Sequence, residues 1–224
     1  MALNNTIGYT PKKRNTYKRK RKKIIAISAE GVNKTEKKYL KKFSDDKVIF
    51  EFTTGGSTDP VNMIKELVEL CEELELDASL GDRAYCLVDL DAKKEKDIQI
   101  AKADRIASKN SDYDIEVIAS NPCFEVWFMC HFGYSTKQYI SSDELLKDLC
   151  KKIKGYAKSR DDIYDLLLPK LDEAIKNAKK LERFNIEAGR KQHTFDFQPS
   201  TEVYKIVEAV KSEQEESRDF ELSK

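Results

Sequence analysis

The sequence lacks any long hydrophobic run. Its longest apolar stretches, such as residues 24–27 and 124–130, fall well short of the ~18 residues that a membrane-spanning helix needs. No apolar segment of about 7–15 residues closely follows the basic N-terminus, so we expect no secretory signal peptide. These absences argue against a membrane protein and predict a cytoplasmic location.

The sequence also lacks the short patterns that mark several common sites. No C-x-x-C pair occurs, and the 5 cysteines form an odd set, which in a cytosolic chain indicates free, mostly buried thiols. Cys123, Cys130 and His131 are close in sequence, but their spacing matches no usual zinc pattern. The P-loop pattern G-x-x-x-x-G-K-[S/T] is absent, so Gly55-Gly56 is better explained as a turn than as a phosphate cradle.

Positive charge is concentrated at the N-terminus. The formal net charge is only +1, but residues 1–23 hold nine Lys and Arg and no acid, which leaves 32 basic and 40 acidic residues in the remainder. Residues 1–22 also lack periodicity, so we predict a disordered basic arm. This arm either lies near a polyanion such as nucleic acid or is a solvated tail that keeps the protein soluble.

Hydrophobic periodicity predicts an α/β fold. Four β-prone runs alternate with helical segments, which favours crossover connections and a mainly parallel four-stranded sheet with flanking helices. After residue 132 only helical patterns follow, and Pro169 interrupts one of them. We therefore predict an α/β core at residues 24–132 and a helical C-terminal region at 133–224. The expected strands lie at 24–30, 48–53, 84–88 and 115–119, and the expected later helices lie at 95–108, 141–153, 161–183 and 201–211.

Acidic residues follow three of the four predicted strands. Glu30 ends the first, Asp89 and Asp91 follow the third, and Glu125 comes shortly after the fourth. In an open parallel sheet, ligands bind beyond the carboxyl ends of the strands. Asp89 and Asp91 are two residues apart, so in extended geometry both side chains face the same way. Converging carboxylates repel each other unless a cation neutralises them, and oxygen ligands suit Mg²⁺ or Mn²⁺.

Each candidate residue also has a purely structural interpretation. A glutamate at a strand end such as Glu30 is usually solvated, and Asp-x-Asp after an apolar run is often a polar turn. Glu125 lies in the first turn of a predicted helix, where the helix dipole favours an acid. His131 on an aromatic helix is more often a hydrogen-bonded core residue than a catalyst. The position of three acidic sites on one edge of a sheet is what favours a function.

Two segments resemble one protein family. Ser28-Ala-Glu30-Gly31 and the following Lys34-Thr35-Glu36-Lys37-Lys38-Tyr39 resemble the EG-x-x-TE-x-x-Y start of RloB-like proteins, which are related to the AbiL abortive-infection component. The run from Asn121 to Phe132 is similar to the NPCFE-x-W-x-x-x-HF signature of that family, and Asp89-Leu90-Asp91 lies between the two in the expected order. Tyr156-x-Lys158 and Pro199-Ser200-Thr201 resemble weaker family features. The resemblance covers about residues 24–210.

The resemblance implies a Toprim-like core, the metal-binding α/β fold of topoisomerases, primases and some nucleases. It implies an acid/base role for Glu30, with Glu30, Asp89 and Asp91 holding the divalent metal. A further acid is expected shortly after the Asp pair, but Lys93 stands there, so Glu125 or Glu36 is the candidate substitute. His131 is then expected to stabilise the leaving group or to orient Glu125.

The function that the resemblance implies is a Mg²⁺- or Mn²⁺-dependent endonuclease. Such an enzyme would act as an effector of bacterial anti-phage defence with an ATPase partner encoded nearby, and we expect RNA, in particular tRNA, to be preferred over DNA. The alternative is a non-catalytic subunit that binds nucleic acid or the ATPase. The sequence leaves the oligomeric state, including a homo-oligomer, open. Four basic residues are candidates for gripping phosphates: Lys158, Arg160, Arg190 and Lys191.

Overall fold

Five strands form one sheet in the computed structural model, which describes residues 21–30, 34–158 and 160–222. Their order is β2-β1-β3-β4-β5; β1 to β4 are parallel and β5 is antiparallel to β4. This confirms the predicted α/β class and the mainly parallel sheet, and it corrects the predicted number of strands from four to five. The strands are β1 Lys23–Ala29, β2 Val48–Phe52, β3 Arg83–Asp89, β4 Ile115–Asn121 and β5 Ser200–Thr201.

Strand β5 has no signal in the sequence because it is only two residues long. Its position is fixed by tertiary pairing, with Ser120 opposite Thr201 and Asn121 opposite Ser200. The hydroxyl oxygens of Ser120 and Thr201 are 2.9 Å apart and buried. A strand too short to show hydrophobic alternation is therefore specified by its partner strand and not by its own pattern.

The strand side chains alternate between two hydrophobic clusters, one on each face of the sheet. Ile25 and Ile27 of β1 belong to one cluster, whereas Ala26 belongs to the other together with Met63 and Leu67. Because neighbouring residues of a strand point to opposite faces, a strand that is covered on both sides must be apolar along its whole length. The continuous apolar runs that marked the strands in the sequence have this cause.

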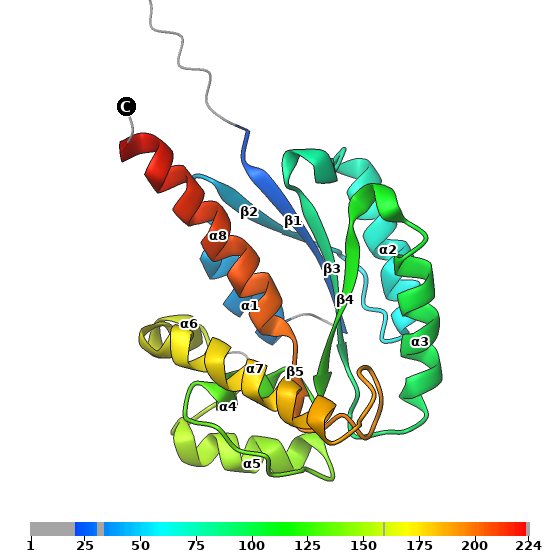
Figure 1. Cartoon of the computed structure of the whole chain (residues 1–224), viewed down its shortest axis with the longest axis vertical. Helices are drawn as coiled ribbons and strands as arrows, with labels where there is room; N and C mark the ends of the chain where they lie inside the picture. The colour runs from blue at the N-terminus through cyan, green and yellow to red at the C-terminus, as the bar shows by residue number, and fades with distance from the viewer. Residues whose placement is uncertain (1–20, 31–33, 159, 223–224) are drawn as a thin grey trace, which may run out of the picture.

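Helices cover both faces of the sheet (Figure 1), with α2 and α3 on one side and α8 on the other. Asp59 caps α2, since its carboxylate accepts a 3.0 Å hydrogen bond from the Asn62 N–H. Pro169 lies in the short turn that separates α6 from α7. The helices are α1 Lys34–Leu40, α2 Pro60–Glu73, α3 Lys96–Ala107, α4 Glu125–Cys130, α5 Ser142–Lys152, α6 Ile163–Leu167, α7 Leu171–Glu187 and α8 Val203–Leu222.

The C-terminal helices share the hydrophobic core of the sheet. Val203, Ile206 and Val207 of α8 are buried in the same cluster as Ile25 and Ile27. Burial of this helix face against the sheet stabilises both parts, because apolar surface gains roughly 25 cal/mol per Å² on burial. No helix of the described residues is long and apolar enough to cross a membrane.

The predicted basic arm at residues 1–22 lies almost wholly outside the described residues. Its last two residues are described and make contacts just before β1. The Arg21 guanidinium is 2.8 Å from the Asp82 carboxylate, which is completely buried, and Lys22 donates a 2.7 Å hydrogen bond to the carbonyl of Asp45.

Candidate active site

Glu30 and Asp89 meet at the carboxyl edge of the sheet because β1 and β3 are parallel neighbours. Ala29 pairs with Leu87, so the residues that end the two strands lie side by side. The backbone N–H of Asp89 donates a 3.3 Å hydrogen bond to Oε1 of Glu30. The structure thus brings together the ends of two strands that are far apart in the sequence.

Asp91 reaches the same edge by a different route from the one that the sequence predicted. Strand β3 ends at Asp89, Leu90 is buried, and Asp91 has a positive φ of 51° in a turn. The expectation of an extended Asp-x-Asp segment is therefore wrong at Asp91. The physical reason is that Leu90 is buried and that the Asp91 N–H donates a 2.8 Å hydrogen bond to the carbonyl of Pro122, the residue after β4. These contacts hold the chain in a turn directly after β3.

Glu125 is almost fully buried beside the segment that follows α5. Its carboxylate is 1% exposed, accepts a 3.0 Å hydrogen bond from the Tyr156 hydroxyl and lies 3.6 Å from the ammonium group of Lys158. The Lys158 carbonyl in turn accepts a 2.9 Å hydrogen bond from the Thr35 hydroxyl in α1. The three separated motifs that carried the family resemblance are therefore linked through these contacts.

The carboxylates of this edge perturb one another. Desolvation raises the pKa of Asp89 well above its usual range, and the charges of Glu36, Glu30, Glu125 and Asp91 raise it further. Burial, with the neighbouring Glu125 and Glu30, also raises the pKa of Glu36 to about 7. We call these five residues the carboxylate cluster. The raised pKa values of Asp89 and Glu36 mean that burial, and then the neighbouring carboxylates, disfavour a negative charge at these two positions.

Lys96 is the principal cation of the carboxylate cluster. Its ammonium group donates a 2.8 Å hydrogen bond to Glu30 and a 2.6 Å hydrogen bond to the Asp89 carbonyl, and it lies 3.1 Å from the Asp91 carboxylate. Burial opposes the charge of Lys96, but the hydrogen bonds to Glu30 and Asp91 outweigh it and raise the pKa of the ammonium group. Lys96 therefore stands between two of the three predicted metal ligands.

The carboxylate oxygens of the cluster are suitable ligands for a hard divalent cation, but the side chains are not placed to coordinate one. Among the described residues, no group of three or more His, Cys, Asp or Glu side chains is arranged to hold a metal ion. Carboxylate oxygens are the ligands that Mg²⁺ and Mn²⁺ prefer, and a bound cation would favour the ionised forms of Asp89 and Glu36, which burial and neighbouring carboxylates disfavour. Binding at Glu30 and Asp91 requires the Lys96 ammonium group to leave its place.

His131 belongs to the core beneath α4. It is 2% exposed, its Nδ1 is 2.9 Å from the Trp127 carbonyl, and its ring packs edge-on against the Trp127 indole. Burial lowers the pKa of His131 to about 4, so the ring is neutral at pH 7. Its buried Nε2 has no hydrogen-bond partner among the described residues, and no contact there links it to the carboxylate cluster.

The four basic residues predicted to grip phosphates lie in different settings. Arg160 forms an ion pair with Asp162, and Arg190 donates 2.7 and 2.8 Å hydrogen bonds to Asn185 and to the Gln198 carbonyl. Lys158 contacts Glu125, as described above. Lys191 is exposed and makes no ion pair with any side chain that the structure describes. Only Lys158 is thus brought to the carboxylate cluster by a direct contact.

The order and geometry of these motifs can be compared with known proteins. The family model described as RloB-like protein matches residues 25–210, which is most of the chain. The chain belongs to the RloB-like family. No curated protein and no solved structure matches it.

One member of the carboxylate cluster in this RloB-like chain and its principal cation were not placed by the residue pattern alone. Lys96 was missed, although it is the first residue of the helix after the Asp pair and a cation at that point was a usable signal. Glu36 was named only as a substitute for a missing acid, and its Thr35-Glu36 context was the available hint. All 5 cysteines are free, four of them buried, as predicted.

Proposed function

We propose that this RloB-like protein is a nuclease that hydrolyses phosphodiester bonds with Mg²⁺ or Mn²⁺. The observation that supports the proposal is the convergence of five carboxylates from separate segments on one edge of the sheet, with the pKa values of Asp89 and Glu36 raised first by burial and then by the neighbouring carboxylates. Clustered carboxylates with perturbed pKa values are typical of catalytic sites. In this proposal the core is a Toprim-like fold.

The protein groups would divide the work of hydrolysis. Glu30, Asp89 and Asp91 would hold the divalent metal, which supplies charge stabilisation to the phosphate oxygens and activates the nucleophile. Glu30 positions the attacking water or sugar hydroxyl, and Glu36, with a pKa of about 7, accepts its proton near neutral pH. The bond from phosphorus to the leaving oxygen then breaks, and the Lys96 ammonium group is a source of a proton or of charge for that oxygen.

The proposed biological role is that of an effector in bacterial anti-phage defence. The support is membership of the RloB-like family and the likeness to the AbiL abortive-infection component seen in the sequence motifs. An ATPase partner would sense infection and control the nuclease. RNA, and tRNA in particular, is the preferred substrate over DNA, because a growth-arresting effector gains most by disabling translation.

A cleavage assay tests this function directly. Purified protein would be incubated with Mg²⁺ or Mn²⁺ and with tRNA, single-stranded DNA or double-stranded DNA, and products would be resolved on a denaturing gel. We expect metal-dependent cleavage that Glu30→Gln and Asp89→Asn abolish and that Glu69→Gln, on the exposed face of α2, leaves unchanged. Cleavage that persists in both cluster variants would refute the site.

A second function has one observation in its favour. The Lys96 ammonium group bridges Glu30 and Asp91, and an ion-paired cluster can serve structure alone. In that case the chain is a binding subunit that docks nucleic acid or its ATPase partner. Thermal melting distinguishes the two functions: a metal that binds the folded state raises stability by RT ln(1 + [L]/Kd), whereas a purely structural cluster gives no shift with Mn²⁺.

A further inference from the structure

A hollow of about 760 Å³ lies beside the turn that follows β3 and the start of α3. It lies between the turn after β3, the segment before α5 and the loop of residues 189–198, which Figure 1 shows in orange beside the ends of β3 and β4. Ala92 and Asp97 line it, and they are the sequence neighbours of Asp91 and Lys96. Its volume falls in the ~300–1,000 Å³ range of small-molecule sites, which is enough for one nucleotide unit.

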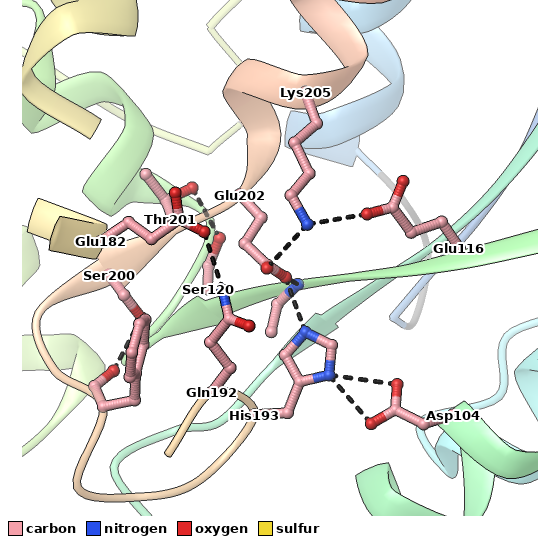
Figure 2. A network of polar contacts seen from close by, with 12 residues as sticks. Asp104, Glu116, Ser120, Glu182, Gln192, His193, Ser200, Thr201, Glu202 and Lys205 are labelled. Carbon is pink, nitrogen blue, oxygen red and sulfur yellow. Dashed lines mark hydrogen bonds and ion pairs between the residues drawn. The ribbon is translucent and has the colours of Figure 1, made fainter. Parts of the chain in front are cut away.

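The 189–198 loop lines one side of this hollow and is held by several hydrogen bonds and ion pairs. Figure 2 shows His193 between two carboxylates: its Nδ1 is 2.9 Å from Asp104 and its Nε2 is 2.7 Å from Glu202. Asn121 of β4 donates through its side chain to the Phe195 carbonyl at 2.9 Å, and the Phe195 N–H donates to Asp97 at 2.7 Å. The loop is therefore tied to α3, β4 and β5 at several points.

The backbone of this loop is held in a conformation that most residues avoid. His193 has φ of 59°, in the left-handed region. A non-glycine residue there costs about 1–2 kcal/mol, and such strain persists only where the surroundings impose it. The His193 side chain is held between Asp104 and Glu202 in this conformation. A loop that is held this firmly keeps its shape before any ligand binds, which lowers the entropic cost of binding.

Two charged side chains of the loop have no polar partner within the described part of the protein. Lys191 and Asp196 both line the hollow and are exposed, and neither side chain has a hydrogen bond or ion pair with a described residue. By contrast, Arg190 and Asp97 are engaged by Gln198 and Phe195. The wall thus offers one unpaired cation and one unpaired carboxylate to a ligand.

We propose that this hollow binds one ribonucleotide of a single-stranded RNA next to the carboxylate cluster, with Lys191 at a phosphate and Asp196 at the ribose 2′-hydroxyl. The inference rests on the proposed nuclease function, because the neighbouring phosphodiester would then lie at Asp91 and Lys96. A DNA strand supplies a phosphate for Lys191 but no sugar hydroxyl for Asp196. An RNA strand supplies both groups in every nucleotide, whatever its base, because the 2′-hydroxyl distinguishes the two nucleic acids.

Binding measured without hydrolysis tests this inference separately from the nuclease function. Fluorescently labelled octamers of riboadenylate and of deoxyadenylate would be titrated with the full chain in EDTA, and anisotropy would give Kd. The variants are Lys191→Ala and Asp196→Ala. The matched control is Lys109→Ala, an exposed lysine just before the loop into β4, at the opposite edge of the sheet from Lys96.

We expect the wild type to bind the ribo-octamer roughly tenfold more tightly than the deoxy-octamer, as one hydrogen bond to a charged group provides. Asp196→Ala should abolish that preference, Lys191→Ala should weaken both complexes about tenfold, and Lys109→Ala should change neither. Equal binding of the two octamers, no binding of either, or hollow variants that bind as the wild type does would overturn the inference. Octamer binding as expected in a protein that cleaves nothing would instead refute the nuclease function alone.

Discussion

Replacing Glu36 by glutamine tests whether the folded protein disfavours a negative charge at this position of the carboxylate cluster. The pKa of Glu36 rises from an ordinary 4.5 to about 7, chiefly by burial and then by the charges of Glu125 and Glu30. Each pKa unit corresponds to 1.36 kcal/mol, so the ionised side chain costs the folded protein about 3 kcal/mol. Because the folded pKa exceeds the unfolded one, stability is greatest below pH 4.5 and falls as pH rises through 7.

Glu36→Gln removes this ionisation, so the variant should unfold less readily than the wild type above pH 7. We expect a gain of about 1–3 kcal/mol at pH 8, less than the full figure because the amide must be accommodated in the same buried position. Below pH 4.5 the gain should vanish, since wild-type Glu36 is then protonated. Urea denaturation in EDTA at several pH values, followed by circular dichroism, measures these differences.

The control for this experiment is Glu69→Gln on the exposed face of α2, whose unfolding free energy should follow that of the wild type at every pH. A Glu36→Gln protein that is less stable than the wild type at pH 8, or that differs from it by the same amount at pH 4 and pH 8, would show that ionised Glu36 does not destabilise the folded protein. Either result would remove the main support for a cation site.

Two further predictions concern cations of the structure. The ion pairs with Asp104 and Glu202 raise the pKa of His193 from 6.5 to about 10, so His193→Gln should lower the free energy of unfolding by about 2–4 kcal/mol at pH 7. This difference, measured by urea denaturation, should shrink as pH rises through 10. An unchanged difference at pH 11 would contradict the ion pairs. Lys96→Met should destabilise the metal-free protein, because the ion pair with Glu30 is lost. It should also increase the rise in melting temperature caused by Mn²⁺, because the ammonium group and the metal compete for Glu30. A smaller rise than in the wild type would mean that Lys96 assists metal binding instead.

The main elements of the fold follow from local sequence patterns. Continuous apolar runs marked four strands, because strands covered on both faces have no polar side. The Asp59-Pro60 pair at the start of α2 is a signal of the same kind, because capping depends on only a few neighbouring residues. These signals are local, and they do not depend on where the rest of the chain lies.

The assembly of the site depends on long-range contacts. Glu30 and Asp89 adjoin because β1 and β3 are neighbours in the sheet, whereas the turn at Asp91 follows from the burial of Leu90. Lys96 occupies its place because α3 begins at the same edge. Sequence analysis predicted which acids would gather there, but it could not show the cation among them.

The sequence by itself determined the α/β class, the family and the acids of one sheet edge, since each depends on residue types and spacings along the chain. Only the tertiary structure decided that β5 completes the sheet, that His131 is a neutral core residue and that Arg190 supports a loop. Those outcomes depend on hydrogen-bond partners and burial, which are set by segments distant in the sequence. The residue type determines which chemical groups a side chain has, and the surrounding structure decides whether that side chain is exposed, paired or buried.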